Sequence, residues 1–271
     1  AGTIKGNHAT TTATVASYGT GNAIDASTST TAAGLDLTNT GTIYGDVKTV
    51  TTQTSTINLN TVNTLATVAS SGLVGNIIVA GTTTNSAINF NQGAGAAQYY
   101  GGTITGTAGL GAVTASTGNT YLTSTTASTS TSTGGLAINT LSVSSNAGLY
   151  LASATAGGSV SANAQARIAS TVTVNGTLGI GAYNSVTAVG ATTIGASGTI
   201  RIGVVGSTAG TYGTLTTSDT TATSGATITI DPSSIGYIAT GTVLDKVITS
   251  TASTTNFTAA TLTETTDSYI Y

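Results

Sequence analysis

The chain of 271 residues has no cysteine, methionine or tryptophan, a single proline, Pro232, and a single histidine, His8. Without cysteine there is no disulfide, no thiolate nucleophile and no Cys/His metal cluster. A Ser-His-Asp relay would depend on His8 alone, and the residues around it form no nucleophile elbow. We therefore expect His8 to be an exposed corner histidine and the protein not to be an enzyme. The lack of cysteine is also typical of bacterial proteins that are exported unfolded.

Charge is almost as scarce, with 5 Lys and Arg, 8 Asp and Glu, and a net charge of −3. The whole stretch between Lys48 and Arg167 contains not a single Asp, Glu, Lys, Arg or His. Cations this few and this scattered form no patch for the phosphates of DNA or RNA. We therefore expect no nucleic-acid partner.

Long apolar runs are missing too. A membrane-spanning helix needs roughly 18 or more apolar residues, whereas residues 73–80 are short, interrupted and typical of a buried strand. We therefore expect no membrane insertion of this segment. The first residues, Ala1 to Ile4, already follow the strand pattern, so the chain looks like a processed or excised piece.

Short strand units bounded by glycine recur along the chain. The string NGTLGI that begins at Asn175 is echoed by SGTIRI, which begins at Ser197. Related units are GTIKG from Gly2, GTIYG from Gly41, GTITG from Gly102 and GATITI from Gly225. A glycine that turns the chain, followed by apolar/polar alternation, indicates a strand with one buried face. Self-similarity with a period in the twenties is typical of a solenoid.

The sequence therefore predicts an all-β fold, a single elongated parallel β-helix (β-solenoid) over residues 1–271, with degenerate rungs of about 20–25 residues. Threonine, which favours strands, makes up about a quarter of the chain, and no helical spacing is sustained. Disorder is the alternative, but the low net charge and the apolar periodicity argue against it. We expect Ile200 and Ile202 to face inward and Arg201 to point outward. Residues 114–135, rich in Ser and Thr, are expected to form a loop or a poorly patterned rung.

The C-terminal part of the chain carries a family resemblance. In order, it holds GTLTT from Gly213, SGATITI from Ser224, GTVLDKVI from Gly241 and DSYIY from Asp267. These strings resemble the passenger regions of bacterial autotransporters just upstream of their membrane barrel, with 226–271 as the passenger C-terminal segment. The resemblance implies a right-handed β-helix and an extracellular location on the bacterial cell surface. The sequence does not include the barrel strands that would follow Tyr271 in such a protein, which a passenger cut from its barrel or a remainder outside the given sequence would each explain.

Carboxylate pairs are the candidate catalytic groups of a less favoured alternative. Stacked rungs would bring Asp36 near Asp46, and Asp231 near Asp245, in the manner of a polysaccharide-active enzyme. Five scattered cations make a lyase improbable. No calcium-binding repeat, metal cluster or phosphate loop occurs, so we expect no metal and no cofactor.

Two side-chain patterns point to binding. Tyr99, Tyr100 and Tyr121 are either packed strand residues or ligand-contacting aromatics on a sugar-binding platform. Thr-x-Thr triplets at 103–105, 171–173 and 227–229 suit ice binding, but they do not recur at one rung position.

The resulting prediction is a non-enzymatic extracellular structural protein that forms a surface stalk, an adhesive fibre or a head-to-tail filament of identical copies. Rung edges with few charges favour such self-association. The alternative is a monomeric adhesin that binds surface glycans or a host surface through 114–135 or the tyrosines. A polysaccharide-active enzyme and an ice-binding protein are the less favoured alternatives.

Overall fold

The computed structural model describes residues 3–5, 21–29, 34–60, 72–80, 86–106, 111–122, 136–151, 165–231, 241–251 and 261–264. Within these ranges every regular element is a β-strand and no helix occurs. Neighbouring strands in the sheets run parallel, as in the pairs β17 with β20 and β21 with β24. The predicted all-β class with parallel pairing is thus confirmed.

The strands form three sheets. The nine-stranded sheet contains, in hydrogen-bonded order, β2 (Asn22–Asp25), β5 (Asp46–Lys48), β8 (Ile77–Val79), β11 (Ile104–Gly106), β13 (Leu136–Ile138), β16 (Gln165–Ile168), β19 (Ser185–Ala188), β22 (Thr214–Thr217) and β25 (Ile248–Ser250). A three-stranded sheet near the N-terminus contains β1 (Thr3–Lys5), β4 (Thr42–Tyr44) and β7 (Gly72–Val74).

The 14-stranded sheet has two branches that share β12 (Ala112–Leu122). Its first branch contains β3 (Asp36–Asn39), β6 (Thr56–Leu59), β9 (Ala87–Asn91), β12, β14 (Thr140–Val143), β17 (Val172–Val174), β20 (Thr192–Ile194) and β23 (Thr220–Ala222). Its second branch contains β10 (Ala97–Tyr100), β12, β15 (Ala147–Leu151), β18 (Thr177–Ile180), β21 (Thr199–Gly203), β24 (Thr227–Asp231) and β26 (Thr261–Glu264).

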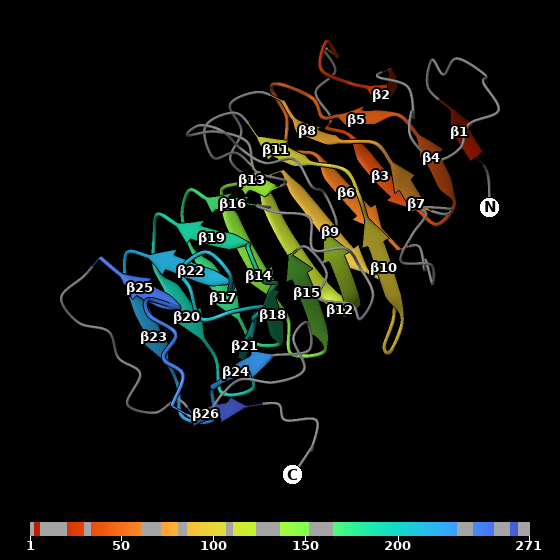
Figure 1. Ribbon diagram of the computed structural model, residues 1–271. Coiled ribbons are helices and arrows are strands. Elements are labelled where there is room, and N and C mark those ends of the chain that lie inside the picture. Colours follow the sequence, from red (N-terminus) through yellow and green to blue (C-terminus); the bar gives the residue numbers. More distant parts are fainter. Residues whose placement is uncertain are drawn as a thin grey trace.

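The order of the strands along the chain is cyclic. From β13 to β24 the chain enters the nine-stranded sheet, then the first branch, then the second branch, and repeats this order. Figure 1 shows the sheets curling around a common interior, with the N-terminal and C-terminal strands at opposite ends. This arrangement is consistent with a parallel β-helix.

The distance along the chain between paired positions varies more than a uniform rung length would allow. Val172 pairs with Thr192, whereas Leu215 pairs with Ile248, so the second interval is longer than the first by more than half. The difference lies in the connections, because paired strands keep the same register while the segments that join them differ in length.

A corner in β12 joins the two branches. Its first part pairs with β9 and β14, and its last part pairs with β10 and β15. The inside/outside alternation changes phase at Ser116 and Thr117, which are both half-buried. Gly118 follows with φ of 71°, a left-handed conformation that glycine adopts without strain. These residues let one strand turn from one wall into the next.

The interior is a stack of inward-facing side chains from all the walls. In the second branch, Leu149, Leu178 and Ile200 occupy one inward column and are fully buried. Ile200 and Ile202 are each 0% exposed, which confirms their predicted inward orientation. Burial of each such side chain stabilises the fold by about 1.5–3 kcal/mol.

Candidate functional site

Three tyrosines form a ladder on the outer face of the second branch. Tyr99 of β10, Tyr121 of β12 and Tyr150 of β15 occupy the same register position on neighbouring strands. The ring centroids of Tyr99 and Tyr121 are 4.7 Å apart with planes 12° apart, and those of Tyr121 and Tyr150 are 4.8 Å apart with planes 17° apart. Because parallel strands lie about 4.8 Å apart, identical positions bring the rings into stacking range without distortion.

Two glycines accommodate the ring of Tyr150. A β-carbon at Gly148, on the same strand and the same face, would lie 2.6 Å from Cε2 of Tyr150 and 2.9 Å from its hydroxyl oxygen. A β-carbon at Gly179, the paired position on β18, would overlap the opposite edge of the ring. The ring therefore packs against the backbone of both glycines, and a larger residue at either position would displace it.

The stacking changes the acidity of the central tyrosine. Partial burial raises the pKa of Tyr121 above its usual value, and the neighbouring phenols of Tyr150 and Tyr99 raise it further, whereas the charge of Arg201 lowers it. The ladder is thus a half-buried aromatic strip.

Tyr100, which was predicted together with Tyr99 and Tyr121 as a ligand-contacting residue, points into the interior. Its side chain is 0% exposed and packs against Phe90, with the ring centroids 6.1 Å apart. Its hydroxyl donates a hydrogen bond to the carbonyl oxygen of Gly75 at 2.8 Å, and burial raises its pKa far above the usual value. Tyr100 is thus a core residue, because adjacent strand residues face opposite sides.

Tyr150 is the functional candidate that sequence reasoning missed. The interval along the chain from Tyr121 to Tyr150 is longer than that from Tyr99 to Tyr121, so no fixed period connects the three. The available signal was the string Tyr-Leu-x-Ser, which occurs at both Tyr121 and Tyr150.

An ion pair lies at the next outward positions along the same sheet. After Gly179, the next outward position holds Arg201, whose side chain is 40% exposed, as expected for an outward residue. Its Nη2 lies 2.6 Å from Oδ2 of Asp231, and its Nε donates to the same oxygen at 2.8 Å. Asp231 is buried and neutralises the cation beside the ladder.

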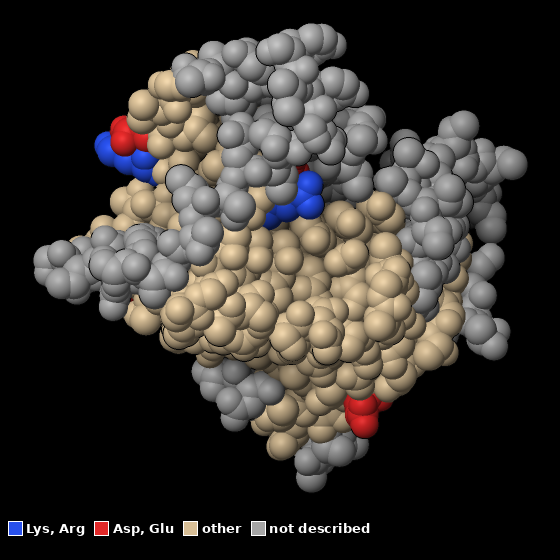
Figure 2. Space-filling model, turned by 90° about the horizontal axis from the view of Figure 1, so that it is seen from below, with Lys and Arg blue, Asp and Glu red and all other residues tan. Residues whose placement is uncertain are grey.

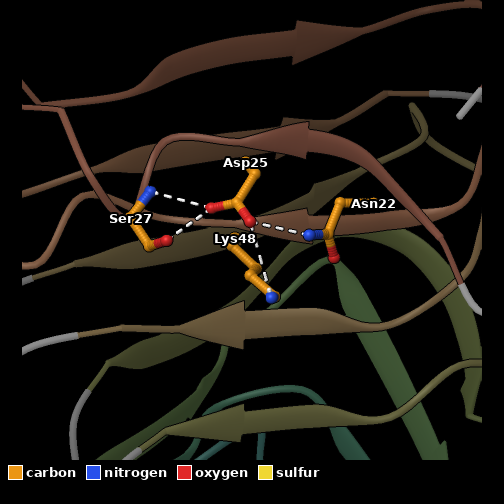
Figure 3. A network of polar contacts seen from close by, with 4 residues as sticks. All are labelled: Asn22, Asp25, Ser27 and Lys48. Atoms are coloured by element: carbon orange, nitrogen blue, oxygen red, sulfur yellow. Dashed lines mark hydrogen bonds and ion pairs between the residues drawn. The ribbon is translucent and has the colours of Figure 1, made fainter.

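A second polar cluster lies at the N-terminal end of the nine-stranded sheet (Figure 3). Asp25 accepts hydrogen bonds from the backbone amide and hydroxyl of Ser27 and from Nδ2 of Asn22, and it pairs with Nζ of Lys48 at 3.5 Å. The hydrogen bonds from Ser27 are the main reason that the pKa of Asp25 lies below its usual value. Oδ1 fixes the turn after β2 through Ser27, and Oδ2 contacts Asn22 of β2 and Lys48 of β5, so the cluster is structural.

The carboxylates predicted as catalytic pairs lie in different surroundings. Asp36 is an exposed residue of β3 in the first branch, whereas Asp46 lies on β5 of the nine-stranded sheet and accepts hydrogen bonds from the amide and side chain of Asn76. Asp231 is engaged by Arg201, and Asp245 is exposed in the segment before β25. His8 lies outside the described residues. Among the described residues, no group of three or more His, Asp or Glu side chains is placed to hold a metal ion.

The threonine triplets lie on three different walls. Residues 103–105 reach into β11 of the nine-stranded sheet, 171–173 into β17 of the first branch, and 227–229 into β24 of the second branch. The last triplet does recur at one position, however, because Thr227 and Thr229 pair with Thr261 and Thr263 of β26. Sequence analysis alone overlooked this repeat, since the two strands lie far apart along the chain.

The first part of the Ser/Thr-rich segment 114–135, expected to be a loop or a poorly patterned rung, is a strand. Residues 114–122 belong to β12, where their side chains alternate between inside and outside. The rest, 123–135, lies outside the described residues. The hydroxyl-rich composition hid this strand, because Thr120 occupies an inward position, where an apolar residue is expected, and is fully buried.

Comparison of the chain with known protein families, with curated proteins and with solved structures found no match. In the ranges that the structure covers, no helix is long and apolar enough to cross a membrane.

Proposed function

We propose that the protein is a non-enzymatic structural β-solenoid, coiled in the right-handed sense of the autotransporter passengers it resembles, and that it acts outside the bacterial cell as a stalk or as a head-to-tail filament. The observation that carries the proposal is the strand edge at each end of the sheets. Among the described strands, β2 and β3 have a neighbour on one side only, and so do β23, β25 and β26. Unpaired parallel edges are templates for further strands.

The surface offers little to oppose such contacts. Figure 2 shows one face on which the charged residues form only small, separate spots. Natural proteins protect sheet edges with charged residues and prolines, and this chain has few charged residues and one proline. Contacts between unlike ends generate open filaments, since the two joining surfaces differ and do not close.

The hydrogen bonds of β23 identify amides that face the free edge. The amide of Thr192 donates to the carbonyl of Asp219, and the amide of Thr223 donates to the carbonyl of Ile194. Residues 219, 221 and 223 therefore face β20, and the alternation of a parallel strand turns the amides of Thr220 and Ala222 away from it.

The substitution Ala222→Pro removes one of these outward amides without removing a hydrogen bond to β20. We expect filaments of the native protein in negative-stain electron micrographs, and shorter or fewer filaments for the proline variant at equal concentration. Ala222→Gly keeps the amide at the same position, adds no polar group to the interior and is the matched control, expected to assemble normally. A native protein that stays monomeric at all accessible concentrations would contradict the filament, and equal assembly of both variants would exclude this edge from the joint.

A further inference from the structure

The fold does not require tyrosine at the three positions of the ladder. The same outward column continues with Gly179, Arg201 and Thr229, so the wall forms equally well with no side chain, a cation or a hydroxyl there. The interior lies on the other side, filled by residues such as Leu149 and Leu178. Three successive tyrosines on the outer face therefore call for an explanation other than core packing.

The rings overlap like roof tiles. Carbon atoms in contact lie about 3.5–4.0 Å apart, so centroid separations of 4.7 and 4.8 Å require the planes to be inclined to the axis of the stack. Tyr150 leans onto Gly179 of the following strand, and the near-parallel planes mean that Tyr121 and Tyr99 lean the same way. Tyr99 is consequently the first ring of the ladder, and no further ring of the described residues stacks on its other face.

Beside the rings runs a column of small and uncharged polar residues. On the N-terminal side of the tyrosines, the next paired outward positions hold Ala97, Asn119 and Gly148, and then Thr177 and Thr199. The strip thus places an apolar aromatic surface next to amide and hydroxyl groups. This combination suits a sugar ring, which has an apolar C–H face and polar hydroxyls at its edge.

The charge of this wall selects among carbohydrates. Along the described outward positions of β10 to β24, Arg201 is the only cation, and Asp231 neutralises it at 2.6 Å. This wall therefore offers no uncompensated positive charge to sulfate, phosphate or uronate groups. The charges on this wall therefore favour a neutral polysaccharide over an acidic one.

We propose that the outer face of the second branch binds a neutral polysaccharide, whose sugar rings pack on Tyr99 and on the exposed parts of Tyr121 and Tyr150. Asn119 supplies an amide for the sugar hydroxyls. This site lies on the outer face of the second branch, with Tyr99 on its first strand, β10, whereas the filament joint proposed above uses the edges of β2, β3, β23, β25 and β26. The two proposals therefore concern different surfaces.

The test is co-sedimentation of purified protein with three insoluble neutral polysaccharides, cellulose, chitin and a branched β-glucan, and with soluble polygalacturonate in affinity electrophoresis as the acidic probe. We expect binding to at least one neutral polymer, little change with salt, and a loss of roughly ten-fold or more in affinity for Tyr99→Ala and Tyr121→Ala. Tyr44→Ala removes a half-buried tyrosine from the three-stranded sheet and is the matched control, expected to bind normally.

Tyr99→Trp separates recognition from folding. It keeps an aromatic ring at this position and should bind as well as the native protein, whereas a purely structural ladder would show stability changes in all variants and binding in none. Absence of binding to every neutral polymer, undiminished binding of Tyr99→Ala, or salt-sensitive binding to polygalacturonate alone would overturn the proposal. Electron micrographs of the same variants report assembly separately, so the two proposals fail independently.

Discussion

Two threonines occupy inward positions where the rest of their column is aliphatic. Ile88, Val113 and Val172 lie in the inward layer of the first branch, and Thr192 and Thr220 continue it at the C-terminal end. Thr192 donates a hydrogen bond to the hydroxyl of Thr217 at 3.1 Å. The hydroxyl of Thr220 is buried and has no hydrogen-bond partner among the described residues. Two similar side chains on adjacent strands therefore differ in whether their polar group is satisfied.

Replacement of Thr220 by valine keeps the branched shape and removes the unpaired hydroxyl. Since a buried unpaired polar group costs about 1–3 kcal/mol, we expect Thr220→Val to raise the free energy of unfolding by about 1 kcal/mol. Thr192→Val loses a hydrogen bond and is the matched control, expected to give no increase. Chemical denaturation followed by far-ultraviolet circular dichroism measures both, and equal effects of the two changes would contradict the assignment.

At the scale of the element, the tyrosine ladder links protonation to strand stacking. The pKa of Tyr121 is raised, so the folded state holds this proton more tightly than the unfolded chain does. The contribution of this proton to the free energy of unfolding is therefore fully present below a pH of about 10, the pKa of an unperturbed tyrosine. It falls as pH rises above that value, because burial, and to a lesser degree the neighbouring phenols, disfavours a phenolate at Tyr121.

This effect can be isolated by ultraviolet absorbance titration of the native protein against Tyr121→Phe. The difference between the two curves should show a midpoint above about 10 for the missing group. Phenylalanine at both Tyr99 and Tyr150 should lower this midpoint only in part, because partial burial is the larger cause of the shift. A difference curve centred on the ordinary tyrosine value would contradict the stacked, half-buried position of Tyr121.

The same ladder shows how far sequence reasoning reaches. Alternation correctly assigned Ile200 and Ile202 to the interior, because a strand places every second side chain on one face. It did not separate Tyr99 from Tyr100, since neither lies in an alternating string that sets the phase. The sequence alone did not predict which tyrosines pair on neighbouring strands. The connections vary in length, so the interval from Tyr99 to Tyr121 differs from the interval from Tyr121 to Tyr150.

At the scale of the whole molecule, the fold is held by ladders and a thin apolar interior, with little contribution from charge. The described residues contain two ion pairs, Lys48 with Asp25 and Arg201 with Asp231. The lowered pKa of Asp25 means that its contribution is present above its ordinary value of 3.8 and is lost as pH falls below it. The raised pKa values of Tyr100 and Tyr121 act only above about 10.

We therefore expect the midpoint of thermal unfolding to stay nearly constant between about pH 5 and 9, a window that lies between these transitions. It should change equally little between roughly 0.01 and 1 M salt, a range over which exposed charges become fully screened. Calorimetry on dilute protein measures both. A shift of many degrees with salt would show that charge contributes far more than the described ion pairs indicate.

The pairing of each strand with its immediate neighbours also determines how the molecule would respond to a pull. A force applied at the C-terminal end loads β25 and β26 first, and each strand that detaches exposes the next one along the sheet. The chain between successive paired positions, such as Val172 to Thr192 or Leu215 to Ile248, then becomes free, so each step releases an extended length on the order of 70–110 Å. Such a molecule unfolds in small steps under force, and the strands that have not yet detached stay folded. This is the mechanical behaviour of a tether under intermittent load.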